Sequence, residues 1–155
     1  MKLLQRWRQF NAPRPNYARD AISLFTRFSQ RHELTYHVKE EPVLDEAGVD
    51  VWWEFPVQSN LQWPVTLMLQ NFDELSFGVP GFWSYFFPFP SVVNKFETYI
   101  DAWVVGKARI VRRPGRWRII SSSDLEFFSE GKWTRVYSGC GDPWPHQNNI
   151  MIQNV

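Results

Sequence analysis

Apolar side chains occupy every second position between residues 49 and 57, which is the strictest pattern in the chain. Successive side chains of a β-strand point to opposite faces of its sheet, so this pattern predicts a strand with one buried face. The residues on that face are Val49, Val51, Trp53, Phe55 and Val57. Runs at 34–39, 61–70 and 75–79 indicate three further strands in the first half of the chain.

Two other stretches repeat their apolar residues at the spacing of a helix. The first runs to about Gln30, with Asn16 placed to cap its first turn. Its apolar stripe consists of Ala18, Ala21, Ile22, Phe25 and Phe28. The second runs from a cap at Ser91 to about Val105, and Gly106 follows at the position where a left-handed residue commonly ends a helix.

Two hairpins are predicted after the second helix. Their turns are expected at Pro114-Gly115 and at Glu130-Gly131, because such dipeptides between apolar runs are typical of tight turns. The four strands would span 107–113, 116–121, 125–129 and 132–137.

The order of elements is therefore one helix, four strands, one helix and four strands. Strands and helices do not alternate, so nothing calls for a parallel sheet. We predict an α+β fold with a large antiparallel sheet of about eight strands in two meanders and both helices on one face. The 155 residues suit a single domain, with a short N-terminal arm at 1–15 and an irregular C-terminal tail at 138–155.

The net charge of +1 hides an uneven distribution of charge along the chain. Residues 1–31 contain seven Lys or Arg and one Asp, residues 32–105 contain two Lys and eleven acidic residues, and residues 106–155 contain eight cations and four carboxylates. We expect the positive and negative blocks to neutralise one another in the folded chain.

Cys140 is the only cysteine, so no intramolecular disulfide can form and a reducing compartment is expected. Gln5, Arg6 and Arg8 interrupt the apolar start that a signal peptide would need. No run approaches the roughly 20 apolar residues of a membrane span. These features predict a soluble, cytoplasmic protein.

The first C-terminal hairpin is the strongest candidate for binding an anion. In the expected register, its cations share one face, while Ala108 and Ile110 point to the core. The cations on that face are Lys107, Arg109, Arg113, Arg116 and Arg118. They could contact the phosphates of a nucleic acid or another phosphate ligand. Alternatively, they pair with Glu126, Glu130 or the acidic middle of the chain.

The segment from Pro80 to Pro90 has three prolines and no regular period, so it is expected to be a loop. Most of its other side chains are aromatic. Exposed together, these rings would form a partner-binding surface, and folded inward they would cover the core. The rings of this candidate site are Phe82, Trp83, Tyr85, Phe86 and Phe89.

Signals for catalysis, metals and cofactors are weak. Cys140 and His146 are close in sequence without an arrangement that would activate a thiolate. Asp124 with Glu130 and Lys132 faintly resembles a metal-dependent nuclease site, but the residues straddle an expected turn. We therefore expect no catalytic residues, no metal and no cofactor.

The leading hypothesis is a non-enzymatic interaction module that holds a protein partner or a second copy of itself through the aromatic segment or a sheet face. The alternative is a nucleic-acid or phosphate-ligand binder that uses the basic hairpin. A third possibility is an enzyme whose site is assembled from residues distant in sequence.

Overall fold

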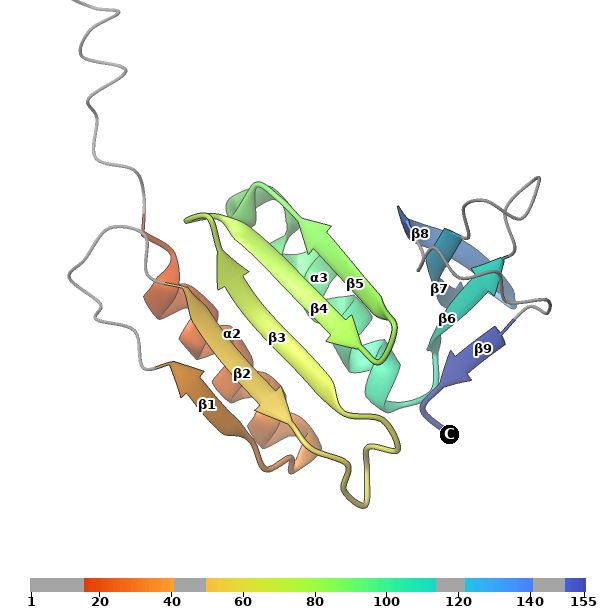
Figure 1. Ribbon diagram of the computed structural model, residues 1–155, viewed down its shortest axis with the longest axis horizontal. Coiled ribbons are helices and arrows are strands. Elements are labelled where there is room, and N and C mark those ends of the chain that lie inside the picture. Colours follow the sequence, from red (N-terminus) through yellow and green to blue (C-terminus); the bar gives the residue numbers. More distant parts are fainter. Residues whose placement is uncertain (1–15, 41–49, 114–121, 141–149) are drawn as a thin grey trace, which may run out of the picture.

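The computed structural model describes residues 16–40, 50–113, 122–140 and 150–155. In this part of the chain, helix α2 (Ala18–His32) is followed by five strands, helix α3 (Phe89–Val104) and four further strands (Figure 1). The first five strands are β1 (His37–Glu40), β2 (Val51–Phe55), β3 (Val65–Gln70), β4 (Glu74–Val79) and β5 (Phe82–Phe86). The last four are β6 (Ala108–Arg113), β7 (Ser122–Ser129), β8 (Lys132–Cys140) and β9 (Ile150–Gln153). The predicted α+β class is confirmed.

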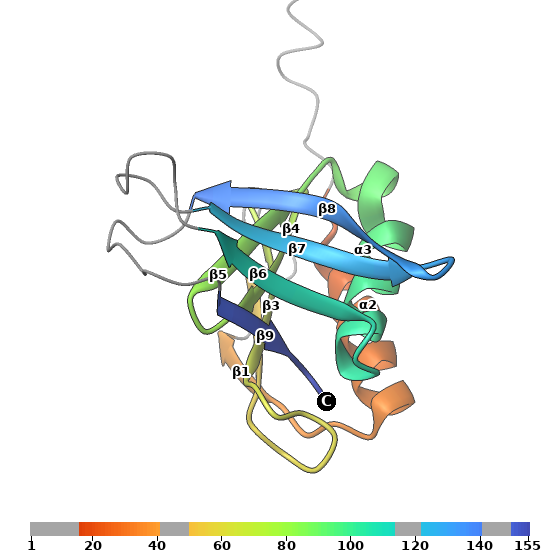
Figure 2. The ribbon, with the colours of Figure 1, turned by 90° about the vertical axis from the view of Figure 1, so that its right-hand side faces the viewer.

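The strands form two antiparallel sheets where the sequence predicts one. The large sheet has the order β1-β2-β3-β4-β5, and the small sheet has the order β8-β7-β6-β9. Both helices pack on one face of the large sheet, as predicted (Figure 1). The small sheet lies beside β5 and α3 (Figure 2). Tyr137 of β8 reaches β5 through ring contacts with Phe82 and Phe86, so side chains join the two sheets at this edge.

Three boundaries differ from the sequence prediction. Strand β5 occupies residues that were expected to form a loop. Strand β6 pairs with β7, with Arg113 opposite Ser122, whereas the predicted partner was a strand at 116–121. That strand and the expected turn at Pro114-Gly115 lie outside the described residues. Strand β9 lies in the stretch expected to be an irregular tail and pairs with β6. By contrast, the turn at Glu130-Gly131 is confirmed, because both residues have the positive φ that such a turn requires.

The two helices bury their apolar stripes against the large sheet. Phe25 packs edge-on against Trp53 with ring centroids 5.9 Å apart, and Phe77 meets Trp103 of α3 at 5.5 Å. Burial of each such side chain stabilises the fold by about 1.5–3 kcal/mol. Neither helix in the described ranges has the length and hydropathy needed to cross a membrane.

Local interactions at the start of each helix explain where it begins. The N-cap residue of α2 is Tyr17, one position after the predicted Asn16, although Asn16 accepts a hydrogen bond from the Ala18 amide at 2.9 Å. Helix α3 begins at Phe89 rather than after Ser91. Pro90 lies in its first turn, where the missing proline N–H would have had no helical partner.

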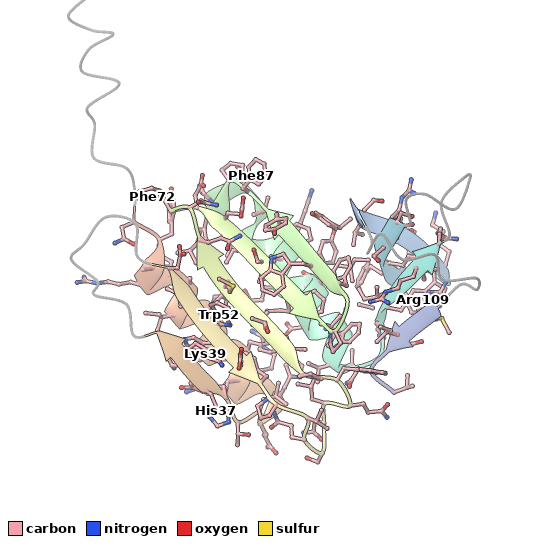
Figure 3. All side chains as sticks on the ribbon, viewed as in Figure 1. His37, Lys39, Trp52, Phe72, Phe87 and Arg109 are labelled. Atoms are coloured by element: carbon pink, nitrogen blue, oxygen red, sulfur yellow. The ribbon has the colours of Figure 1, made fainter. Side chains whose placement is uncertain are left out.

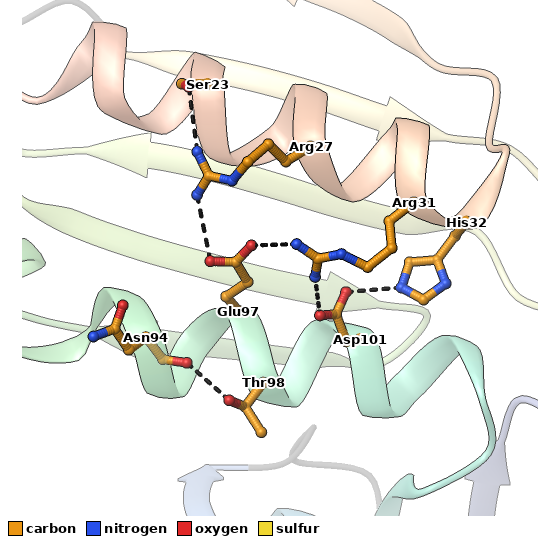
Figure 4. Close-up of polar contacts among 8 residues, drawn as sticks. All are labelled: Ser23, Arg27, Arg31, His32, Asn94, Glu97, Thr98 and Asp101. Atoms are coloured by element: carbon orange, nitrogen blue, oxygen red, sulfur yellow. Dashed lines mark hydrogen bonds and ion pairs between the residues drawn. The ribbon is translucent and has the colours of Figure 1, made fainter.

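Ion pairs join the two helices on their outer side (Figure 4). Arg27 and Arg31 contact the Glu97 carboxylate at 3.3 and 2.7 Å. Asp101 accepts a hydrogen bond from Arg31 and lies 2.7 Å from Nε2 of His32. The positive first block of the chain therefore pairs directly with the acidic middle block.

We expect Glu97→Gln to lower the free energy of unfolding by up to about 1 kcal/mol near pH 7. Burial raises the pKa of Glu97, but hydrogen bonds from Arg31 and Arg27 outweigh it and hold the pKa below its ordinary value. A carboxyl group with a lowered folded-state pKa stabilises the fold above its unfolded pKa and loses this effect as the pH falls through the folded pKa. Urea denaturation should therefore show a lower free energy of unfolding for Glu97→Gln than for wild type near neutral pH, and equal values in acid. An equal difference at both pH values would contradict this assignment.

Candidate interaction face of the large sheet

The large sheet has one face that no helix covers within the described part of the chain. Both helices lie behind the sheet in Figure 1, so the opposite face is turned toward the viewer. We call this side the open face. It carries the strand residues that alternate with the core positions, and Figure 3 labels His37, Lys39 and Trp52 from the same side.

One row of the open face takes a residue from every strand of the large sheet. The pairing register places these residues side by side, from β1 at one edge to β5 at the other. In order, the row consists of His37, Glu54, Thr66, Gly78 and Trp83. Large side chains therefore stand at both ends, and small ones stand in the middle.

The small residues in the middle leave a cavity of about 450 Å³, which we call the trough. All five members of the row line it. Pro56, Pro64 and Pro80 also line the trough, where strands β2, β3 and β4 begin or end. A pocket of this size is large enough to take one long side chain or a small ligand.

The Trp83 ring forms one wall of the trough because it lies over Gly78. A Cβ atom added to Gly78 would be 2.2 Å from Cε3 and Cζ3 of this ring, which is too close for any side chain. Glycine at this position therefore allows the indole to lean across the sheet toward Thr66.

Glu54 supplies a carboxylate at the other end of the trough. Its Oε2 lies 3.4 Å from Nζ of Lys39, and the two side chains are 35% and 53% exposed. Lys39 itself does not line the trough. The open face therefore carries an accessible negative group opposite an aromatic wall.

A second row of the open face is apolar and aromatic. It runs through Trp52, Met68, Ser76 and Tyr85, one residue from each of β2 to β5. Tyr85 is 43% exposed, whereas Ser76 is fully buried. Trp52 Nε1 and Ser76 Oγ are buried without a hydrogen-bond partner among the described residues. Each buried polar group left unpaired costs about 1–3 kcal/mol, so these two atoms carry a desolvation cost that no described residue offsets.

Strand β5 divides the predicted aromatic site between two faces of the sheet. Phe82 and Phe89 are each only 5% exposed and belong to the core. Phe86 packs on Phe96 of α3 at 5.6 Å. Only Trp83 and Tyr85 of the five predicted residues lie on the open face. The expected loop is therefore wrong at 82–86, where the segment is a strand, and its rings are shared between the core and the open face.

The basic face predicted after the second helix is paired with carboxylates. Arg109 contacts Glu126 at 2.8 Å, and Arg113 contacts Glu126 at 2.5 Å and Asp124 at 3.1 Å. The hydrogen bond to Asp124 raises the pKa of Arg113, as does the charge of Glu126. Lys107 is exposed, and Ala108 and Ile110 point to the core as predicted.

The other chemical candidates are not gathered into a site. Arg116, Arg118 and His146 lie outside the described residues. Cys140 is the last residue of β8. Within the described ranges, no group of three or more His, Cys, Asp or Glu side chains is placed to hold a metal ion.

Comparison with known proteins adds no assignment. No protein-family model, no curated protein and no solved structure matches the chain significantly. The assignment of a function therefore depends on the open face itself.

Proposed function

We propose that the protein is a non-enzymatic interaction module that binds a protein partner through the open face of the large sheet. The observation that carries this proposal is the row of Trp52, Met68, Ser76 and Tyr85, which combines aromatic surface with two buried, unpaired polar atoms. Aromatic residues on an accessible sheet face are typical of the centres of protein interfaces. The single cysteine supports a cytoplasmic setting for this interaction.

The partner that best fits this row is an extended protein segment with apolar side chains and a nearby hydrogen-bond acceptor. Apolar side chains would cover the exposed part of Tyr85, beside Met68, which is already buried. An acceptor would satisfy Nε1 of Trp52 after a small rotation of its ring, because an indole N–H can only donate. Both gains are available on the open face alone, since the helices already cover the other face.

The alternative of nucleic-acid binding has less support from the described residues. Three arginines of the small sheet lie against two carboxylates, with Arg109, Arg113 and Arg135 around Glu126 and Asp124. Cations that are already paired gain less from phosphates, because their carboxylate partners must first be displaced or left unpaired. We therefore favour binding of a protein partner over binding of a nucleic acid.

A random peptide library displayed on phage tests the proposed function. Peptides selected on the wild-type protein should lose about tenfold or more in affinity for Tyr85→Ala, because truncation of a hot-spot aromatic typically costs about 2 kcal/mol or more and about 1.4 kcal/mol is already tenfold. Met151→Ala is the control, since Met151 is 59% exposed on the small sheet and away from the open face. Selected peptides that bind both variants like wild type, or a library that gives no binder, would contradict the proposal. A dimer of the protein that dissociates in Tyr85→Ala would support the same face, with a second copy as the partner.

A further inference from the structure

We infer that the trough binds the cationic side chain, arginine or lysine, of the partner segment that occupies the open face. This inference rests on the proposed function and adds the chemistry that the partner must bring. It follows from the shape of the trough, the groups at its two ends and the charge of the residues that line it.

The shape of the trough suits a long, unbranched side chain. Neighbouring strands lie about 4.8 Å apart, so three spacings separate the backbones of Glu54 and Trp83 by roughly 14 Å. The Trp83 ring covers the spacing nearest to it, because it lies over Gly78. Thr66 lines the bottom of the remaining part of the trough. The length of this part matches an extended arginine or lysine whose methylene stem lies along apolar surface.

The two ends of the trough suit the two parts of such a side chain. The Glu54 carboxylate can accept charge-assisted hydrogen bonds from a guanidinium or ammonium group. The Trp83 ring at the other end supplies apolar surface for the methylene stem. The Glu54 side chain is 35% exposed, so its carboxylate is accessible, and a bound cation competes with the Lys39 ammonium that lies 3.4 Å from its Oε2.

The charge of the groups that line the trough favours the same ligand. Glu97 and Asp101 of the acidic middle block are paired with Arg27 and Arg31 on the helix side, and among the described residues Glu54 is the only carboxylate that lines the trough. Within the described ranges, His37 is the only basic residue that lines the trough. An anionic or phosphate group would meet Glu54 with like charge, whereas a cation gains from Glu54.

A charge-neutral arginine analogue tests this inference. Each selected peptide is compared with a copy in which citrulline replaces its arginines or norleucine replaces its lysines, on wild type and on Glu54→Gln. We expect either change alone to weaken binding about tenfold and both together to weaken it little further, because each removes the same charge-assisted contact. Glu74→Gln is the matched control, since Glu74 lies on the open face at the far end of β4. Its carboxylate accepts hydrogen bonds from the side-chain amides of Gln70 and Asn71.

Lys39→Met provides a second test with the opposite sign. Removal of the resident ammonium should raise the affinity of cationic peptides by up to about fivefold, as expected for loss of a weak surface pair. Equal affinities of the charged and neutral peptides, or equal losses in Glu54→Gln and Glu74→Gln, would overturn the inference. Peptides that depend on Tyr85 without a required cation would overturn it too, and they would leave the proposed function standing. Peptides whose binding does not depend on Tyr85 would contradict both this inference and the proposed function.

Discussion

Replacing Asn154 by alanine is expected to lower the free energy of unfolding by about 2–3 kcal/mol, although the residue lies next to the last position in the chain. Asn154 is only 5% exposed. Its Oδ1 accepts a hydrogen bond from the Gln62 amide at 2.6 Å, and its Nδ2 donates to the carbonyl oxygens of Asn60 at 3.1 Å and Val104 at 2.7 Å. Alanine would leave all three backbone groups without this partner.

Urea denaturation checks this effect, and Val155→Ala is the control. Val155 is 76% exposed, so its truncation should change the free energy of unfolding by less than about 0.5 kcal/mol. If Asn154→Ala were as stable as Val155→Ala, the side chain of Asn154 would not hold the small sheet to the loop before β3 and to the end of α3.

Replacing Glu126 by glutamine is expected to lower the free energy of unfolding by about 2 kcal/mol, because it leaves two guanidinium groups without a full counter-charge. The Glu126 side chain is 7% exposed, and its partners Arg109 and Arg113 are 23% and 47% exposed. Solvent screens the more exposed arginine, so the loss stays below that of a fully buried pair. Chemical denaturation measures it.

Glu130→Gln is the matched control for this substitution, because it removes the same charge from an exposed turn. It should leave stability within about 0.5 kcal/mol of wild type. The same two variants also test anion binding by the basic face. Glu126→Gln should bind fluorescein-labelled poly(dT) more tightly than Glu130→Gln, because only Glu126→Gln releases paired arginines. Equal stability of the two variants would contradict the paired network.

The sequence predicted most elements whose two faces differ in polarity. Strand β2 alternates clearly because one of its faces packs under the helices, and both helices carry apolar stripes for the same reason. Strand β5 escaped prediction because both of its faces are aromatic. Phe82 and Phe86 face the core, while Trp83 and Tyr85 lie on the open face, so no period of two appears.

The candidate site could not be predicted from the sequence, because it depends on strand register. His37 and Trp83 are 46 positions apart in the chain, and only the pairing of five strands places them in one row. Thr66 and Gly78 carry no chemical signal alone, and they matter because their small size opens the trough. One signal was present: Trp52 occupies a position that the alternation of β2 assigns to the polar face.

The most direct measurement of the proposed interaction uses the nine tryptophans of the chain as reporters. Indole N–H signals of ¹⁵N-labelled protein are assigned by substitution and followed by NMR as a selected peptide is added. Binding at the open face predicts shifts for Trp52 and Trp83, with the buried Trp103 and the small-sheet Trp133 unchanged. A shift of Trp133 without Trp52 and Trp83, or no shift of these two at saturation, would contradict the assignment of the open face as the binding surface.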